Sequence, residues 1–238
     1  METAVRTKTT TLALITAAVI AAGCMVPEDP GDPGAAPEQS ASAPGESLEG
    51  QFDREGMDQY VDAVVPMITE YMQETWPDMP LPEVVYVPGG YTGREGCLDQ
   101  SGRQATATAA SYEYCPVDRA VYVGQDMLWE FYTRTGDAGP AVGLAHEFGH
   151  HVQSELGLTL ENMSSVDVEN QADCIAGAWT RFTDERGWLE REDDLKDIET
   201  LFPLIGSAED PTRDHGTAQE RAASFEAGFN GGVEACGL

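Results

Sequence analysis

Basic side chains are scarce in this chain of 238 residues: 13 lysines and arginines stand against 42 aspartates and glutamates, for a formal net charge of −29. A surface this acidic repels the phosphates of nucleic acids and the headgroups of anionic lipids. The composition therefore argues against a nucleic-acid partner and against electrostatic adhesion to a membrane. It is typical of a solvated surface, and it favours cationic substrates over anionic ones.

The chain also has little that would cross a membrane. The apolar run at residues 11–22 has twelve residues, whereas a spanning helix needs about twenty. A short basic segment with Arg6 and Lys8 precedes this run, which predicts a signal peptide at residues 1–23. The run ends in Ala-Ala-Gly-Cys at 21–24, which resembles the lipobox of bacterial lipoproteins and predicts lipidation of Cys24. The alternative is a plain secretory signal with an incidental cysteine.

Both interpretations predict export of the chain, and the lipobox predicts an anchor on the outer face of the bacterial cell membrane. Residues 24–50 are rich in Pro, Gly, Ala, Ser and Glu without apolar periodicity, so we expect a disordered tether there. Residues 51–238 are long enough for a single domain with its own core. The sequence carries no coiled-coil repeat from which to predict an oligomeric state.

Cysteines other than Cys24 are even in number, which in an oxidising compartment predicts disulfides. Three pairings are possible. We favour Cys97 with Cys115, which closes a local loop, and Cys174 with Cys236, which ties the C-terminus to a central helix. Zinc ligation by cysteine is the alternative, although no C-x-x-C spacing occurs.

Apolar periodicity predicts an α+β fold that is mostly helical, with a small β-sheet ahead of the helix that carries the histidines. Gly157 is expected to cap that helix at its C-terminus, and Asp214 is expected to cap the last helix at its N-terminus. The expected helices are 55–75, 125–135, 138–156, 166–187, 191–203 and 215–229, and the expected strands are 83–87 and 120–123.

Histidine is scarce too, and three of the four histidines fall between 146 and 151. Residues 146–150 have the pattern H-E-x-x-H, with His146, Glu147 and His150 at its defined positions. On a helix, residues four apart share a face, so both imidazoles can reach one Zn²⁺ while the glutamate lies beside them as a general base. A buried structural pair is the plainer interpretation. His151 points away from this face and is expected either to pack or to make a surface hydrogen bond.

A catalytic zinc takes a third protein ligand and keeps one position for water. Leu156 occupies the place where another common pattern has its third histidine. Glu169 follows on the next expected helix, with Asp173 four residues later, placed to accept a hydrogen bond from a ligating histidine. By spacing alone, Glu161 and Asp167 compete with Glu169.

Four segments stand out in order along the chain: 114–122 (YCPVDRAVY), 144–153 (LAHEFGHHVQ), 169–179 (ENQADCIAGAW) and 215–221 (HGTAQER). Together they resemble the bacterial family of neutral zinc metallopeptidases, and the resemblance covers roughly residues 80–238. This resemblance implies a zincin-like fold and a peptidase with His146, His150 and Glu169 as zinc ligands and Glu147 as the base.

In metallopeptidases of this design a histidine or tyrosine stabilises the oxyanion, and His215, Tyr114 and Tyr122 are the candidates here. His215 has the alternative of simply starting the last helix. The strand region 114–123 is expected to pair with an extended peptide substrate.

The leading hypothesis is therefore a lipid-anchored zinc metallopeptidase that acts on peptides or proteins. A zinc-stabilised binding lipoprotein without catalysis is the alternative. The low histidine count argues against a third interpretation, a zinc reservoir.

Overall fold

The computed structural model describes residues 47–91, 94–98, 104–158, 160 and 162–238. The predicted signal peptide, the lipidation site Cys24 and most of the predicted tether lie outside these residues, as does Glu161. Within the described residues, no helix is long and apolar enough to cross a membrane.

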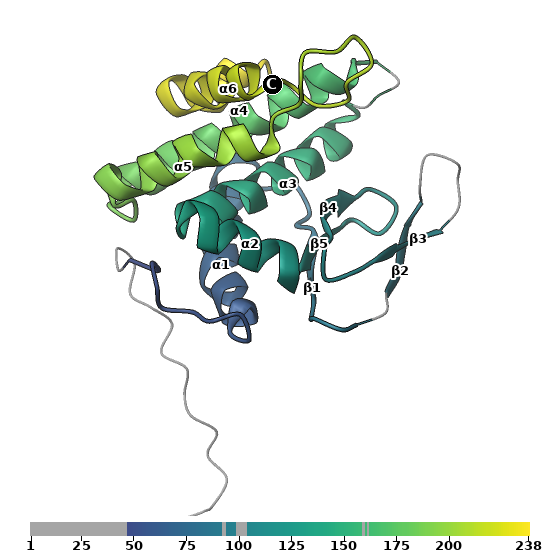
Figure 1. Cartoon of the computed structure of the whole chain (residues 1–238). Helices are drawn as coiled ribbons and strands as arrows, with labels where there is room; N and C mark the ends of the chain where they lie inside the picture. Colours follow the sequence, from purple (N-terminus) through teal and green to yellow (C-terminus); the bar gives the residue numbers. More distant parts are fainter. Residues whose placement is uncertain (1–46, 92–93, 99–103, 159, 161) are drawn as a thin grey trace, which may run out of the picture. The chain divides into compact units, whose positions relative to one another are not determined.

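The described residues form a mostly helical α+β fold in which a small sheet precedes the helix of the H-E-x-x-H pattern, as predicted (Figure 1). The helices are α1 (Met57–Thr75), α2 (Gln125–Thr135), α3 (Ala138–Leu156), α4 (Ser165–Glu185), α5 (Arg191–Ile205), α6 (Ala218–Gly231) and the 3₁₀ turn η1 (Val233–Cys236). The strands are β1 (Glu83–Val87), β2 (Arg94–Leu98), β3 (Gln104–Ala107), β4 (Tyr112–Cys115) and β5 (Ala120–Gly124).

The main sheet has the order β1-β5-β4, with β1 parallel and β4 antiparallel to the central β5. Strand β4 therefore lies at one edge. Strands β2 and β3 form a separate antiparallel pair. Neither β2 nor β3 is predicted from the sequence, because this connection reads as polar turns and loops, whereas β4 overlaps the start of the expected strand region 114–123.

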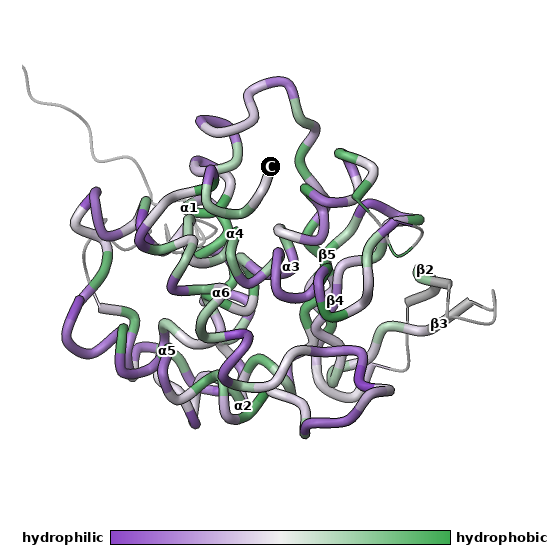
Figure 2. Tube along the Cα trace, turned by 90° about the horizontal axis from the view of Figure 1, so that it is seen from above, coloured by the Kyte–Doolittle hydropathy of each residue, from purple (hydrophilic) through white to green (hydrophobic). Residues whose placement is uncertain are grey.

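Side chains of β5 alternate between the two faces of the sheet. Val121 and Val123 join the main core together with α1, α3 and α4, whereas Tyr122 joins a second apolar cluster with Val85 and Cys115. Figure 2 shows hydrophobic residues along β5 and a largely hydrophilic first half of α5. The face of the sheet that carries Val121 is thus the one that meets the histidine helix.

Two helix ends test the expected caps. Gly157 ends α3 in the left-handed conformation that favours glycine, as predicted. The prediction of Asp214 as a cap is wrong: α6 begins after Thr217, whose hydroxyl accepts from the Glu220 N–H while the Glu220 carboxylate accepts from the Thr217 N–H. This capping box satisfies the backbone N–H groups of both Thr217 and Glu220. Helix α6 therefore begins three residues later than the predicted start at residue 215.

Helices α4 and α6 approach each other closely through glycines. A Cβ atom on Gly177 would lie 2.0 Å from the Phe225 carbonyl oxygen, and one on Gly228 would lie 1.8 Å from the Cys174 carbonyl oxygen. The predicted disulfides Cys97–Cys115 and Cys174–Cys236 are both confirmed, and the second joins α4 to the C-terminal turn η1.

Candidate metal centre

Helix α3 holds His146 and His150 one turn apart, with ring centroids separated by 4.6 Å. The helix is buried along most of its length, because the residues around the histidines are small or apolar. His146 is 6% exposed, and the His150 side chain is 18% exposed. Both imidazoles are therefore largely buried, His150 less so than His146.

Helix α4 supplies the carboxylate that faces them. Gly149 lets α4 approach α3, since a Cβ atom there would meet the backbone of Ala172 at 3.0 Å. Glu169 comes from the preceding turn of α4. Its oxygens lie 3.3 Å from Nε2 of His146 and 3.4 Å from Nε2 of His150.

These separations test whether the three side chains suit zinc. A tetrahedral zinc ion with bonds of 2.0–2.1 Å keeps neighbouring ligand atoms about 3.3 Å apart. His146, His150 and Glu169 match that spacing, and their ligand atoms all lie within 4.8 Å of one another. The competing Asp167 is exposed at the start of α4, where it accepts from the Ser164 hydroxyl. The donor set therefore fits a single zinc ion.

The outer nitrogen of His146 is tied to a buried ion pair. Nδ1 of His146 lies 2.8 Å from Asp173 Oδ1, and Arg221 donates to both oxygens of Asp173 from Nε at 2.8 Å and Nη2 at 2.9 Å. A carboxylate held in this way accepts the Nδ1–H of the imidazole. The Nε2 lone pair is then directed towards Glu169 and a metal.

His150 has a neutral partner that the sequence reasoning missed. Its Nδ1 lies 2.8 Å from Oε1 of Gln153, which is itself almost fully buried. The spacing in the sequence could have indicated this contact, because a residue three positions after His150 lies on the same face of α3.

Glu147 lies beside the histidines and points to the edge strand. Its Oε2 accepts from the backbone N–H of Tyr114 at 2.7 Å, and the residue is 8% exposed. Burial raises the pKa of Glu147, although the neighbouring His146 and His150 act in the opposite direction. A raised pKa brings a carboxylate closer to the range in which it exchanges protons near neutral pH.

The ligands themselves are electrostatically linked. Burial by itself would lower the pKa of His146, but Asp173 and Glu169 raise that pKa to about 10. Burial by itself would raise the pKa of Glu169, but hydrogen bonds with His146, His150 and His215 hold it well below its usual range. Glu169 is therefore negatively charged at neutral pH, as a metal ligand must be.

The structure brings His215 to the site but not Tyr122. Nδ1 of His215 lies 2.9 Å from Oε2 of Glu169. Tyr122 instead points to the opposite face of the sheet, where its hydroxyl donates to Asp118 at 2.5 Å, so its predicted catalytic role is corrected. The Tyr114 hydroxyl contacts His151, whose ring is fully buried, so packing is the one of its two expected roles that the structure supports.

A cavity of about 480 Å³ opens beside the three donors. Part of its wall is apolar and part consists of the charged and polar groups described above. The apolar side chains come from α2, α3 and α5, and the tyrosines from β4. The lining residues are Ala110, Tyr112, Glu113, Tyr114, Met127, Phe131, Val142, Gly143, His146, Glu147, His150, Glu169, Asp173, Leu201, Ile205, His215 and Arg221.

An H-E-x-x-H helix with a glutamate from the following helix defines the zincin-like class of site. Within that class, the chain belongs to the family described as "Putative neutral zinc metallopeptidase", which matches residues 95–237. The resemblance drawn from the four sequence segments is thereby confirmed.

Two relatives show the extent of the similarity. "Uncharacterized protein YpfJ" of Escherichia coli (strain K12) is 32% identical over 145 residues, covering 50% of each chain. "Uncharacterized protein Mb2605" of Mycobacterium bovis is 30% identical over 151 residues, covering 50% of this chain and 51% of the relative. The chain thus spans about half the length of the curated relatives it matches. No solved structure matches significantly.

Proposed function

We propose that this chain is a zinc-dependent peptidase that hydrolyses bonds in peptides or proteins. The observation that carries the proposal is the convergence of His146, His150 and Glu169 at ligand spacing, with Glu147 beside them and a cavity in front. A zinc ion held by these three side chains supplies a Lewis acid that polarises a carbonyl group and makes water more acidic.

Glu147 is the general base of the proposed reaction. Its carboxylate accepts a proton from the attacking water and passes it to the amine that leaves. The Tyr114 N–H donates to one of its oxygens, which fixes the carboxylate in orientation and leaves the other oxygen for the water. Burial, which raises its pKa, makes the carboxylate a stronger base for the first of these transfers.

Strand β4 is the surface along which we place the substrate. It lies at the edge of the sheet, and the Tyr114 N–H that contacts Glu147 belongs to its free side. An extended peptide that pairs with such an edge is held by main-chain hydrogen bonds. Its scissile bond would then lie next to Glu147.

His215 is the group we assign to the carbonyl oxygen of the substrate. It lines the cavity, and its contact with Glu169 directs the imidazole into the site. That hydrogen bond raises the pKa of His215, which favours the protonated, donating form. Tyr122 is excluded from this role by its position on the other face of the sheet.

The open cavity favours catalysis over the alternative of a zinc-stabilised binding protein. A purely structural zinc site has four protein ligands and no open position. Among the described residues, the metal-ligating side chains grouped at this site are His146, His150 and Glu169.

Export and lipid anchoring at Cys24 remain part of the proposal. The signal-like N-terminal segment motivates them. The two disulfides support an oxidising compartment, because such bonds are rare where thiols are kept reduced.

The test of the function is Glu147→Gln. We expect one equivalent of bound zinc, as in the wild type, and peptide-library cleavage reduced about 10²–10⁴-fold by loss of the base. Glu155→Gln is the matched control: it makes the same change on the same helix, outside the cavity, and should leave cleavage intact. Cleavage by Glu147→Gln at the wild-type rate would refute the assignment.

A further inference from the structure

The two histidines at the candidate zinc site have outer partners of different kinds. His146 bonds to the charged Asp173, whereas His150 bonds to the neutral amide of Gln153. A carboxylate only accepts hydrogen bonds, so it fixes the tautomer of His146 by itself. An amide offers both a donor and an acceptor, so something else has to orient Gln153.

The backbone carbonyl of Val168 orients the amide of Gln153. Nε2 of Gln153 lies 2.7 Å from the Val168 oxygen. Because a carbonyl oxygen only accepts, the NH₂ end of the amide must face Val168. Oε1 then faces His150, whose Nδ1 must carry the proton, and the Nε2 lone pair of His150 is free for a metal.

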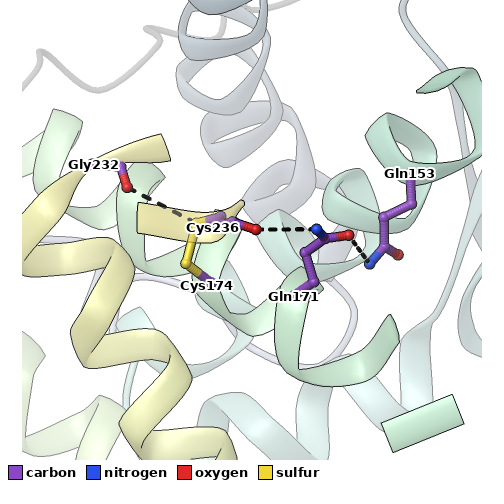
Figure 3. The surroundings of a disulfide bond; sticks show 5 residues. All are labelled: Gln153, Gln171, Cys174, Gly232 and Cys236. Carbon is purple, nitrogen blue, oxygen red and sulfur yellow. Dashed lines mark hydrogen bonds between the residues drawn. A yellow bond between two sulfur atoms is a disulfide. The ribbon is translucent and has the colours of Figure 1, made fainter. Parts of the chain in front are cut away.

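Gln171 is oriented in the same way, by a backbone carbonyl, and in turn contacts Gln153. Its Nε2 donates to the backbone carbonyl of Cys236 at 3.0 Å, so its Oε1 faces Gln153 and accepts from the second N–H of that amide at 3.1 Å. Figure 3 shows the two glutamines in line with the Cys236 carbonyl. Every donor in the series from His150 to Cys236 points the same way.

The disulfide fixes the end of this series. Cys236 lies in the short 3₁₀ turn η1. Its bond to Cys174 fastens η1 to α4, the helix that also carries Gln171 and Glu169 (Figure 3). Cys174 and Cys236 are both buried. The accepting carbonyl is thereby held in place relative to the metal ligands.

We propose that Gln153 and Gln171 are positioning residues for His150, and that the Cys174–Cys236 disulfide anchors them through the Cys236 carbonyl. We call this series the glutamine relay. It acts on zinc affinity by fixing the tautomer and ring orientation of His150. The inference rests on the proposed function, since it assigns His150 as a zinc ligand.

Graded variants separate the links of the glutamine relay. Gln153→Met removes the acceptor for His150 at nearly constant shape. Gln171→Glu keeps an oxygen facing Gln153 but removes the donor to Cys236, and Gln171→Met removes both links. We expect the zinc Kd to rise about 10–100-fold for Gln153→Met, which is usual for loss of such a partner, and by smaller factors for the two Gln171 variants.

Three measurements distinguish a specific loss of zinc affinity from a general loss of stability. Zinc affinity is measured on the full chain by competition with a chromophoric chelator at fixed pH. The visible spectrum of the Co²⁺ form reports the geometry of the ligands. Thermal unfolding of the metal-free variants, with circular dichroism, reports folding separately, and only variants that fold are compared.

The disulfides provide the matched control. Cys174→Ser with Cys236→Ser should weaken zinc binding and shift the Co²⁺ spectrum, whereas Cys97→Ser with Cys115→Ser should leave both unchanged. Equal effects of the two pairs, or wild-type affinity and spectrum in folded Gln153→Met, would overturn the glutamine relay while leaving the zinc site intact. A wild type that binds no zinc would overturn both proposals.

Discussion

The buried pair beneath His146 predicts a large and specific loss of stability when Arg221 is replaced by methionine. Arg221 and Asp173 are 5% and 2% exposed, and they share two hydrogen bonds of 2.8 and 2.9 Å. Methionine keeps much of the packing of the arginine stem but removes the charge. The Asp173 carboxylate then stays buried without the guanidinium, with His146 as its remaining partner.

The expected cost follows from the charge that remains. Removing one member of a buried ion pair costs about 3–5 kcal/mol, because the other charge has lost both water and its partner. His146 still donates to Asp173 and, with its pKa raised to about 10, carries a positive charge at pH 7 in the metal-free protein, so we expect the lower end, about 3 kcal/mol. Adding Asp173→Asn to Arg221→Met removes the stranded charge and should recover part of that loss.

The assay is urea unfolding of the metal-free protein at pH 7, so that zinc binding does not contribute to the free energy. Arg134→Met is the control, because its pair with Glu130 is about half exposed and should contribute less than about 1 kcal/mol. If Arg221→Met costs no more than Arg134→Met, or if the double variant is less stable than Arg221→Met, the reasoning about the stranded carboxylate is wrong.

Two further substitutions test the packing and the acidic groups. Gly228→Ala should lower the free energy of unfolding by about 3 kcal/mol in urea titrations, because its Cβ would overlap the Cys174 carbonyl, whereas Ala227→Ser on the exposed side of α6 should change little. Burial and neighbouring carboxylates raise the pKa of Asp194 to about 7, so its contribution to stability is present below the unfolded pKa and lost as the pH rises towards 7. Asp194→Asn should therefore gain about 1–2 kcal/mol over the wild type at pH 8 and nothing at pH 4, and a gain independent of pH would contradict the assignment.

The helices could be predicted closely where their signals are local. The periodicity of α3 and the glycine that ends it lie within one stretch of sequence, and its expected range 138–156 agrees with the structure. The predicted start of α6 is too early, because both Asp214 and Thr217 are suitable N-cap residues and only Thr217 is followed three residues later by a glutamate that completes a capping box. The sequence does not predict β2 and β3, because these strands are short and largely polar.

Some residues of the candidate site can also be predicted from local sequence, and others cannot. His146, Glu147 and His150 are fixed by helical spacing, so the sequence alone was sufficient to group them. The choice of Glu169 over Asp167 needed the family resemblance, since spacing permits both. Tyr122 shows a signal that was present but unused: Val121 and Val123 flank it in a buried strand, so it had to face away from the layer they join.

The glutamine relay shows what a sequence of this kind does not reveal. Its acceptors are the backbone carbonyls of Val168 and Cys236, and every residue type carries such a carbonyl. No choice of side chain at either position therefore marks the contact. Gln153 and Gln171 acquire their roles only once α4, η1 and the disulfide bring those carbonyls to them, which is a property of packing between elements far apart in the chain.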